Sequence, residues 1–187
     1  MSGSSAFSLC LRLFETEAFL SLRSSFLIRP LTEHVSGYEL DDNAARTDFA
    51  VVHAWLAGSY WSPGISRAKV ETGAANSALV IGAFYIKEGV ETNGAGIQVG
   101  FLRVISDTTR FAYICDVFVD PAHRGKGLAK QMVQFAINHP DLTEVSRWLL
   151  ATRDAHEVYR TVGFDGLPEP SRWMQFLPPA QKDCQAC

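Results

Sequence analysis

The stretch FVDPAHRGKGLAKQMV, residues 118–133, constrains the fold of this chain more than any other segment. A β-branched, apolar run ends at Pro121, and a short loop with two cationic side chains and two glycines follows. Apolar residues then recur at the spacing of one helical face. This face consists of Leu128, Met132, Phe135 and Ala136. The pattern predicts a strand, a tight loop and a helix that begins at the loop.

The loop has the features of an anion-binding helix terminus. A helix N-terminus presents free backbone N–H groups and the positive end of the helix dipole, which suit a phosphate. Gly125 and Gly127 let the backbone approach an anion closely, while Arg124, Lys126 and Lys130 add positive charge. The alternative is a solvated turn that only starts a helix, and the local pattern leaves both interpretations open.

Two common phosphate-binding motifs do not fit this loop. The P-loop requires a lysine and a hydroxyl residue after its last glycine, but Leu128 follows Gly127. The dinucleotide fingerprint requires a third glycine where this chain has Lys130. A different kind of phosphate site is therefore expected.

Composition favours a single globular domain. The chain has 187 residues, of which 47% are hydrophobic and 20% are charged, enough for a well-packed core. The net charge of -3 gives no overall attraction to nucleic acid or to an anionic membrane. No segment approaches the roughly 18 apolar residues of a membrane span. Nucleic acid and membrane are therefore not expected partners, and a polyanion must be bound by a local patch.

The two ends of the chain differ from its middle. Residues 1–34 are rich in Ser, Leu, Phe and Arg, which fits either a mitochondrial targeting segment or an extra helix, although Glu15 and Glu17 weaken the targeting interpretation. Residues 179–187 form a tail that ends in Cys184 and Cys187, without a second ligand pair for a metal. With Cys10 and Cys115, these cysteines do not form a secreted disulfide pattern. A cytoplasmic location and no metal are expected.

Residues 35–178 read as one α/β domain in the order β-α-α-β-β-β-α-β-α-β. This order predicts an α/β sandwich, an α+β arrangement in which helices flank one mixed, mostly antiparallel sheet. Asp48 or Thr47 is expected to cap the first helix, and Gly163 to end the last one. The expected strands are GYELDD, ALVIGAFYIK, IQVGFLRVIS, RFAYICDVFVD, SRWLLAT and a closing strand RWMQFL, with a polar hairpin loop, EGVETNGAG, after the second.

Two motifs in this order resemble those of the GNAT superfamily of N-acetyltransferases. Residues 124–129, RGKGLA, match the acetyl-CoA signature R-x-x-G-x-A, and residues 155–164, AHEVYRTVGF, match A-x-x-x-Y-x-x-x-G-F. The resemblance covers about residues 38–177. It implies acetyl transfer from acetyl-CoA directly to a primary amine of a small molecule or peptide. A catalytically weak acyl-CoA sensor or interaction module of the same fold is the alternative, and a homodimer is compatible with either.

The resemblance also assigns roles to residues. The loop after Arg124 would wrap the pyrophosphate of the cofactor, and backbone groups of the preceding strand would hold the pantetheine arm and polarise the thioester carbonyl. Side-chain identity matters little for such contacts, so simple core packing is equally compatible with the strand residues. The predicted cofactor-binding residues are Val117, Phe118, Val119, Arg124, Gly125, Lys126, Gly127, Leu128 and Ala129.

Two residues are candidate catalytic groups. Tyr159 occupies the tyrosine position of the family motif and is predicted to protonate the leaving thiolate, with packing alone as the alternative. Asp116, inside an apolar strand, is either the general base or a structural carboxylate that accepts hydrogen bonds from the backbone or from an arginine, and a water chain is a third route for the proton. Thr152 stands where many relatives carry an asparagine.

The resemblance also implies an acceptor site near the aromatic segment HAWLAGSYWSPG. His53, Trp55, Tyr60 and Trp61 would either border the acceptor amine, where an aromatic face attracts a cation, or pack in the core. The sequence does not identify the acceptor, and it leaves Arg147, Arg153 and His156 without a role.

Overall fold

The computed structural model describes residues 37–86 and 96–178. The expected sheet is confirmed: five strands lie in the order β1-β2-β3-β4-β5, antiparallel except for the parallel pair β4 and β5. The strands are β1 (Tyr38–Asp41), β2 (Leu79–Tyr85), β3 (Ile97–Ser106), β4 (Ala112–Val119) and β5 (Trp148–Leu149). The helices are α1 (Phe49–Ala57), α2 (Arg67–Ala75), α3 (Leu128–Ile137) and α4 (His156–Arg160), with 3-10 turns η1 (Ala44–Arg46), η2 (Pro121–His123), η3 (Pro140–Leu142) and η4 (Pro170–Arg172).

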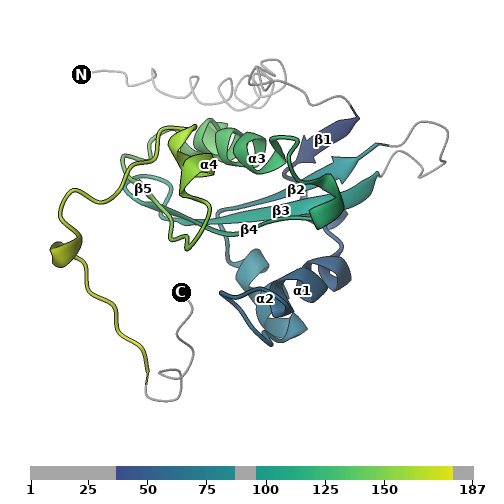
Figure 1. Cartoon of the computed structure of the whole chain (residues 1–187), viewed down its shortest axis with the longest axis horizontal. Coiled ribbons are helices and arrows are strands. Elements are labelled where there is room, and N and C mark those ends of the chain that lie inside the picture. Colours follow the sequence, from purple (N-terminus) through teal and green to yellow (C-terminus); the bar gives the residue numbers. More distant parts are fainter. Residues whose placement is uncertain (1–36, 87–95, 179–187) are drawn as a thin grey trace, which may run out of the picture.

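Helices cover both faces of the sheet, with α3 and α4 on one side and α1 and α2 on the other (Figure 1). Alternation along β2 explains this arrangement, because successive side chains of a strand point to opposite faces. Leu79 and Ile81 belong to the core shared with α3, whereas Val80 packs with Phe101 against α1 and α2. Val52 and Leu56 of α1 are fully buried there.

Local caps set where the helices begin. Asp48 caps α1, as one of the two expected residues, with its carboxylate accepting hydrogen bonds from the backbone amides of Ala50 and Val51. Ser66 caps α2 in the same way. None of the helices in the described residues is long and apolar enough to cross a membrane.

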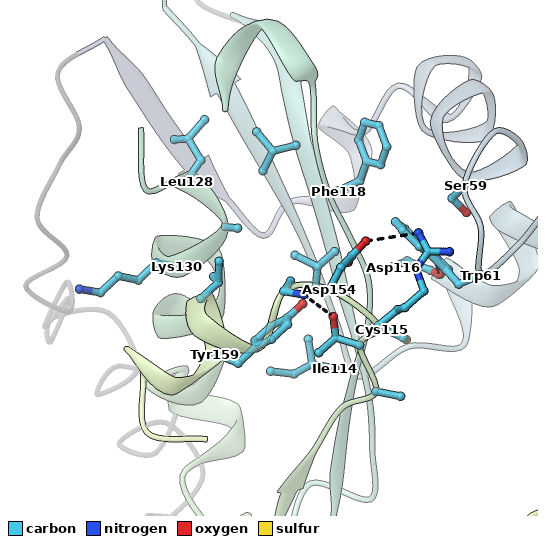
Figure 2. Close-up of a pocket in the computed structure, with 18 of the residues that line it drawn as sticks. Ser59, Trp61, Ile114, Cys115, Asp116, Phe118, Leu128, Lys130, Asp154 and Tyr159 are labelled. Carbon is cyan, nitrogen blue, oxygen red and sulfur yellow. Dashed lines mark hydrogen bonds and ion pairs between the residues drawn. The ribbon is translucent and has the colours of Figure 1, made fainter. Parts of the chain in front are cut away.

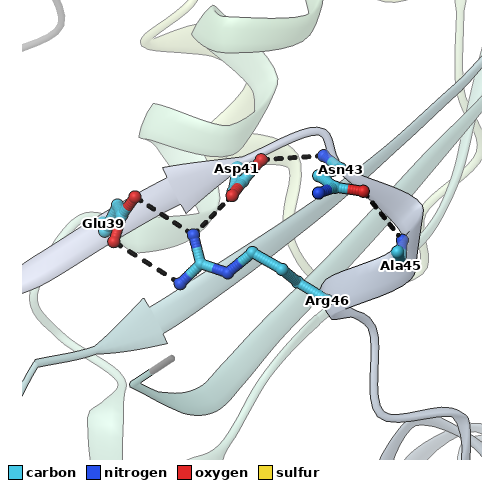
Figure 3. A network of polar contacts seen from close by, with 5 residues as sticks. All are labelled: Glu39, Asp41, Asn43, Ala45 and Arg46. Carbon is cyan, nitrogen blue, oxygen red and sulfur yellow. Dashed lines mark hydrogen bonds and ion pairs between the residues drawn. The ribbon is translucent and has the colours of Figure 1, made fainter. Parts of the chain in front are cut away.

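Charged side chains form ion pairs along β1, the edge strand at one end of the sheet. Arg46 of η1 reaches back to the carboxylates of Glu39 and Asp41 on β1, and Asn43 caps η1 by accepting from Ala45 (Figure 3). The Arg46 guanidinium also lies 4.1 Å from the centre of the Phe84 ring. Charged side chains on an edge strand discourage pairing with another chain, so β1 is a protected edge.

The predicted closing strand is wrong. Arg172 ends η4 and residues 173–177 continue without joining the sheet, and Met174 and Phe176 are 96% and 84% exposed. The alternating apolar pattern is present, but the neighbouring edge strand β5 has only two residues with which to pair. The segments predicted as an N-terminal extension (residues 1–34), a hairpin loop and a tail with the Cys184–Cys187 pair lie wholly or almost wholly outside the described residues. The domain boundaries stay a prediction.

The turn that follows helix α4 contains a glycine, Gly163, with a left-handed backbone conformation. The amide of Phe164 donates to the carbonyl of Tyr159, and that of Gly163 to the carbonyl of Arg160, which is the Schellman pattern. Gly163 has a φ of 94°, a left-handed angle that glycine adopts without strain. The Phe164 ring packs edge-on against Tyr159, with ring centres 6.2 Å apart. The helix end therefore helps to position Tyr159.

We expect Gly163→Ala to lower the free energy of unfolding by about 1–2 kcal/mol, because alanine is strained at this φ. Gly166→Ala is the matched control, since both glycines have open space where a Cβ would lie but only Gly163 has a left-handed φ. The control should change stability by less than about 1 kcal/mol, and in the stabilising direction if its φ suits alanine. Urea denaturation of both variants measures the difference, and equal losses would contradict the role of the backbone angle.

Candidate functional site

Strands β4 and β5 separate soon after they meet. They pair only at Ala112 with Trp148 and at Tyr113 with Leu149, although β4 continues to Val119. The edge of β4 beyond Tyr113 therefore lines an open groove of about 1460 Å³ rather than a sheet interior. Parts of four segments form most of its walls, namely 58–62, 113–119, 123–130 and 151–161, and Arg103 and Ile105 of β3 complete them. Such a volume exceeds that of an ordinary small-ligand pocket and suits a long ligand.

A bulge interrupts β4 at the centre of this groove. Phe101 pairs with Phe118 and Arg103 with Cys115, so that two residues of β4 lie opposite Leu102 alone. The first of them, Asp116, has a φ of 55°, a left-handed angle that aspartate tolerates better than most residues. Because a bulge redirects the backbone and its side chains, the strand no longer presents a regular edge here.

At one end of the groove, the tip of α3 presents unpaired backbone amides. Gly125 and Gly127 have φ of 74° and 78°, and a Cβ on either would meet nothing within 4 Å. The backbone angle, not crowding, thus requires glycine at both positions. Gly127 precedes α3 without a side-chain cap, and within the described residues the amides from Gly125 to Lys130 donate to no acceptor. This row of donors at the positive end of a helix is suited to a phosphate group.

The loop before α3 is fixed on both sides. The Arg124 side chain donates from Nε to the carbonyl of Val119 at 2.9 Å, and its guanidinium lies 5.6 Å from the centre of the Phe118 ring. His123 is joined through Nδ1 to the Tyr38 hydroxyl at 2.8 Å. Arg124 therefore ties the loop to the end of β4. All the predicted cofactor-binding residues line the groove except Lys126.

Tyr159 is buried beside the groove, on the opposite wall from Ser59 and Trp61 (Figure 2). Only 9% of its surface is exposed, and its hydroxyl has no hydrogen-bond partner within the described residues. Burial raises the pKa of Tyr159 to about 12, and the nearby Tyr60, Asp154 and Tyr113 shift it in the same direction. The phenol is thus protonated at neutral pH and has a proton to donate.

Asp116 is held by two partners on the α1 side of the sheet. Arg103 donates from Nε to its Oδ2 at 2.5 Å, and the indole of Trp61 donates to its Oδ1 at 3.2 Å. The side chains of Asp116 and Arg103 are only 9% and 20% exposed. Both carboxylate oxygens are thus engaged, and this geometry favours the structural alternative for Asp116 over the base.

The remaining candidates divide between the groove and the core. Tyr60 and Trp61 line the groove, whereas Trp55 stacks on Phe118 with ring centres 5.1 Å apart. His53 is joined through Nε2 to the carbonyl of Ile65 at 3.0 Å. The aromatic segment thus contributes two residues to the site and two to packing around it.

Two further residues have local roles. The Thr152 hydroxyl accepts from the amide of Ala155 at 3.0 Å and so supports the start of α4. Burial raises the pKa of the Cys115 thiol to about 12, so that no thiolate is available there at neutral pH. Within residues 37–86 and 96–178, no group of three or more His, Cys, Asp or Glu side chains could hold a metal ion.

Sequence reasoning missed the partners of Asp116 and the Tyr38–His123 contact. Arg103 and Trp61 lie 13 and 55 positions away from Asp116 along the chain. The charged Arg103 within an apolar strand was a usable signal, because a buried arginine requires a counter-charge.

Residues 53–164 match the model of the acetyltransferase (GNAT) family. The chain belongs to this family. A Gibberella zeae protein named as an acetyltransferase is 32% identical over 153 residues, covering 71% of this chain and 84% of the relative. A Glycine max protein named histone acetyltransferase TAP1 is 32% identical over 108 residues, covering 55% of this chain and 46% of the relative. The chain therefore spans less than half the length of this soybean relative.

Solved structures agree with the fold. A GNAT-family acetyltransferase structure from Xanthomonas campestris pv. campestris is 36% identical in sequence and has a TM-score of 0.67. The match covers 76% of this chain and 94% of that one. One from Deinococcus radiodurans has a TM-score of 0.60 at 15% identity, covering 81% of this chain and 94% of that one. The second likeness concerns the fold alone. The family match and the Xanthomonas structure together indicate that this chain is an acyltransferase of the GNAT acetyltransferase family.

We expect Asp116→Asn to lower the free energy of unfolding by about 1–3 kcal/mol, because it removes the charge that faces the largely buried Arg103. Asparagine tolerates the left-handed φ and can still accept from Trp61, so the change isolates the ion pair. Glu71→Gln is the control, since its ion pair with Arg67 is exposed and worth less than about 1 kcal/mol. Chemical denaturation of both variants measures the losses. A loss for Asp116→Asn no larger than for the control would remove the proposed structural role.

Proposed function

We propose that this protein transfers an acetyl group directly from acetyl-CoA to a primary amine of a small molecule or a peptide. One observation carries the proposal: the open edge of β4 and the unpaired amides of the α3 tip line the same groove as Tyr159. A Clostridium acetobutylicum acetyltransferase of similar fold, with a TM-score of 0.50 and 16% identity, was solved with acetyl-CoA. The soybean relative's name includes histone, which makes a lysine-bearing peptide one acceptor to test.

The groove fits a long ligand with a diphosphate. The amides from Gly125 to Lys130 have no acceptor within the described residues, and the two glycines leave their surroundings open. These amides would bind the diphosphate, and the β4 backbone from Val117 to Val119 would bind the amide groups of the pantetheine arm. Both sets of contacts use main-chain atoms, so the apolar side chains of the strand are compatible with them.

The reaction itself requires the removal of protons from the amine and the delivery of a proton to the leaving thiolate. The nitrogen of the free amine attacks the thioester carbonyl, a C–N bond forms, and the C–S bond breaks. Tyr159 donates its phenolic proton to the departing thiolate and regains one from solvent. A β4 amide at the bulge stabilises the negative charge that develops on the carbonyl oxygen. Water in the groove takes one proton from the incoming ammonium before the attack and a second from the nitrogen once the C–N bond has formed, because both oxygens of Asp116 are engaged.

A second candidate function is an acyl-CoA-binding module without turnover. The observation in its favour is the engagement of Asp116, which leaves no strand carboxylate free to act as a base. The two functions share the cofactor site and differ only at the acceptor end. Calorimetry with coenzyme A and thiol release from acetyl-CoA with an amine panel separate them. Binding with no release on any amine supports the module, and no binding of coenzyme A overturns both.

We expect Tyr159→Phe to lower kcat by about 10²-fold or more, because the thiolate would leave without a positioned acid. The dissociation constant of coenzyme A should be unchanged, since the proposed contacts to the cofactor are made by backbone groups elsewhere. Tyr85→Phe is the control, because it also removes one hydroxyl but lies away from the groove. Thiol-release assays measure kcat, and calorimetry measures the dissociation constant of coenzyme A.

The pH profile adds a second readout for Tyr159. With a pKa of about 12, its acid form persists well above neutrality. The wild-type kcat should therefore not decline up to about pH 10, the ordinary pKa of a tyrosine. Equal losses of kcat and of coenzyme A affinity in Tyr159→Phe would mean that the residue only packs.

A further inference from the structure

The guanidinium of Arg153 lies in the groove between two groups that attract cations. Its Cζ is 3.7 Å from the centre of the Tyr60 ring, and its Nη2 is 3.3 Å from Oδ2 of Asp154. All three residues line the groove. An aromatic face and a carboxylate are the two kinds of group with which proteins bind organic cations. Here a side chain of the chain itself occupies that position.

The aromatic face does not depend on this guanidinium. The hydroxyl of Tyr60 accepts a hydrogen bond from the backbone amide of Arg153 at 3.1 Å. The ring also meets Trp61 edge-on, with ring centres 4.9 Å apart and an angle of 83°. Trp61 is in turn held by Asp116. The face of Tyr60 therefore stays in place when the Arg153 side chain moves away.

The Arg153 side chain is easily displaced. It is 65% exposed, and that of Asp154 is 61% exposed. Ion pairs between such exposed groups are weak, because water solvates both charges well. The exchange of this guanidinium for another cation would therefore cost little.

The position is next to the proposed reaction centre. Tyr60 and Asp154 both influence Tyr159, which places them around its phenol. They lie at the wall formed by residues 58–62 and 151–155, while the proposed diphosphate site lies at the α3 tip. A group bound by Tyr60 and Asp154 would belong to the acceptor and not to the cofactor.

We propose that Tyr60 and Asp154 form a subsite for a second cationic group of the acceptor, and that Arg153 occupies this subsite until such an acceptor displaces it. The inference rests on the proposed acetyl transfer and narrows its acceptors to amines that carry another ammonium or guanidinium group. A diamine or a peptide with a basic residue next to the reacting amine supplies this chemistry.

The opposite assignment, in which Arg153 binds an anionic acceptor, fits the geometry less well. A carboxylate that approached this guanidinium would also meet Asp154 and the negative face of the Tyr60 ring. The charge of Arg153 already has a partner in Asp154. The Tyr60 ring and the Asp154 carboxylate thus favour a cation at this position over an anion.

The test compares acceptors that differ only in the second charge. Putrescine is paired with butylamine, and the blocked peptide Lys-Arg with Lys-norleucine, so that small and peptide sources are distinguished. In the wild type, kcat/KM should be about three- to tenfold higher for the dicationic member of at least one pair. Arg153→Gln should lower KM for that acceptor several-fold and leave its monocationic partner unchanged.

Further variants separate the subsite from general effects. Asp154→Asn, an exposed change, and Tyr60→Leu should each abolish the preference for the second charge. Arg160→Gln is the control, because it removes an exposed arginine of α4 that does not line the groove, and it should preserve the preference. A preference retained in Asp154→Asn, or a KM for dicationic acceptors raised by Arg153→Gln, would overturn the proposal.

Failure of the subsite and failure of acetyl transfer give different results. Equal kcat/KM for the charged and uncharged partners, with thiol release on both, overturns the subsite alone. No release on any amine overturns acetyl transfer. Calorimetric titration of putrescine into the coenzyme A-saturated protein then tests the subsite, with weaker binding to Asp154→Asn expected and equal binding contrary to it.

Discussion

The early separation of β4 from β5 is the constraint on which the rest of the site depends. Backbone amides and carbonyls require partners, and most strand edges inside a domain find them in a neighbouring strand. Here the parallel pairing ends at Tyr113, while β4 runs on for the length of the groove. The sheet thus leaves its own polar edge to water or to a ligand. A ligand rich in amide groups can complete that edge.

The bulge at Asp116 connects this open edge to the other face of the sheet. An extra residue in β4 redirects the strand backbone, and the same residue sends its carboxylate to Arg103 and Trp61. The left-handed angle is an unfavourable local choice that the ion pair helps to maintain. Trp61 belongs to the segment 58–62, which also carries Tyr60 and lines the groove. The hydrogen bond from Trp61 to Asp116 therefore fixes the position of this segment relative to the bulge.

Much of the fold, and the glycine loop that opens α3, could be predicted from the sequence because their signals are local. The glycines before α3, its apolar stripe and the Tyr159 motif each occupy a few neighbouring residues. The partners of Asp116 could not be predicted in this way, since strand register decides which distant residues meet. The expected strand at residues 172–177 was wrong for a related reason: a strand needs a partner edge, and β5 offers only two residues.

Under the proposed function, the two ends of the groove differ in the kind of atoms that would recognise a ligand, and this difference has a chemical consequence. At the α3 tip the donors are backbone amides, so a substitution that alters backbone angles, as at Gly125 or Gly127, would lower affinity directly, while Arg124, Lys126 and Lys130 add positive charge nearby. At the acceptor end the contacts are side chains, and Arg153 and Asp154 are largely exposed. Single surface substitutions can therefore change the acceptor preference. Binding of the acyl donor and the position of the buried Tyr159 would not change.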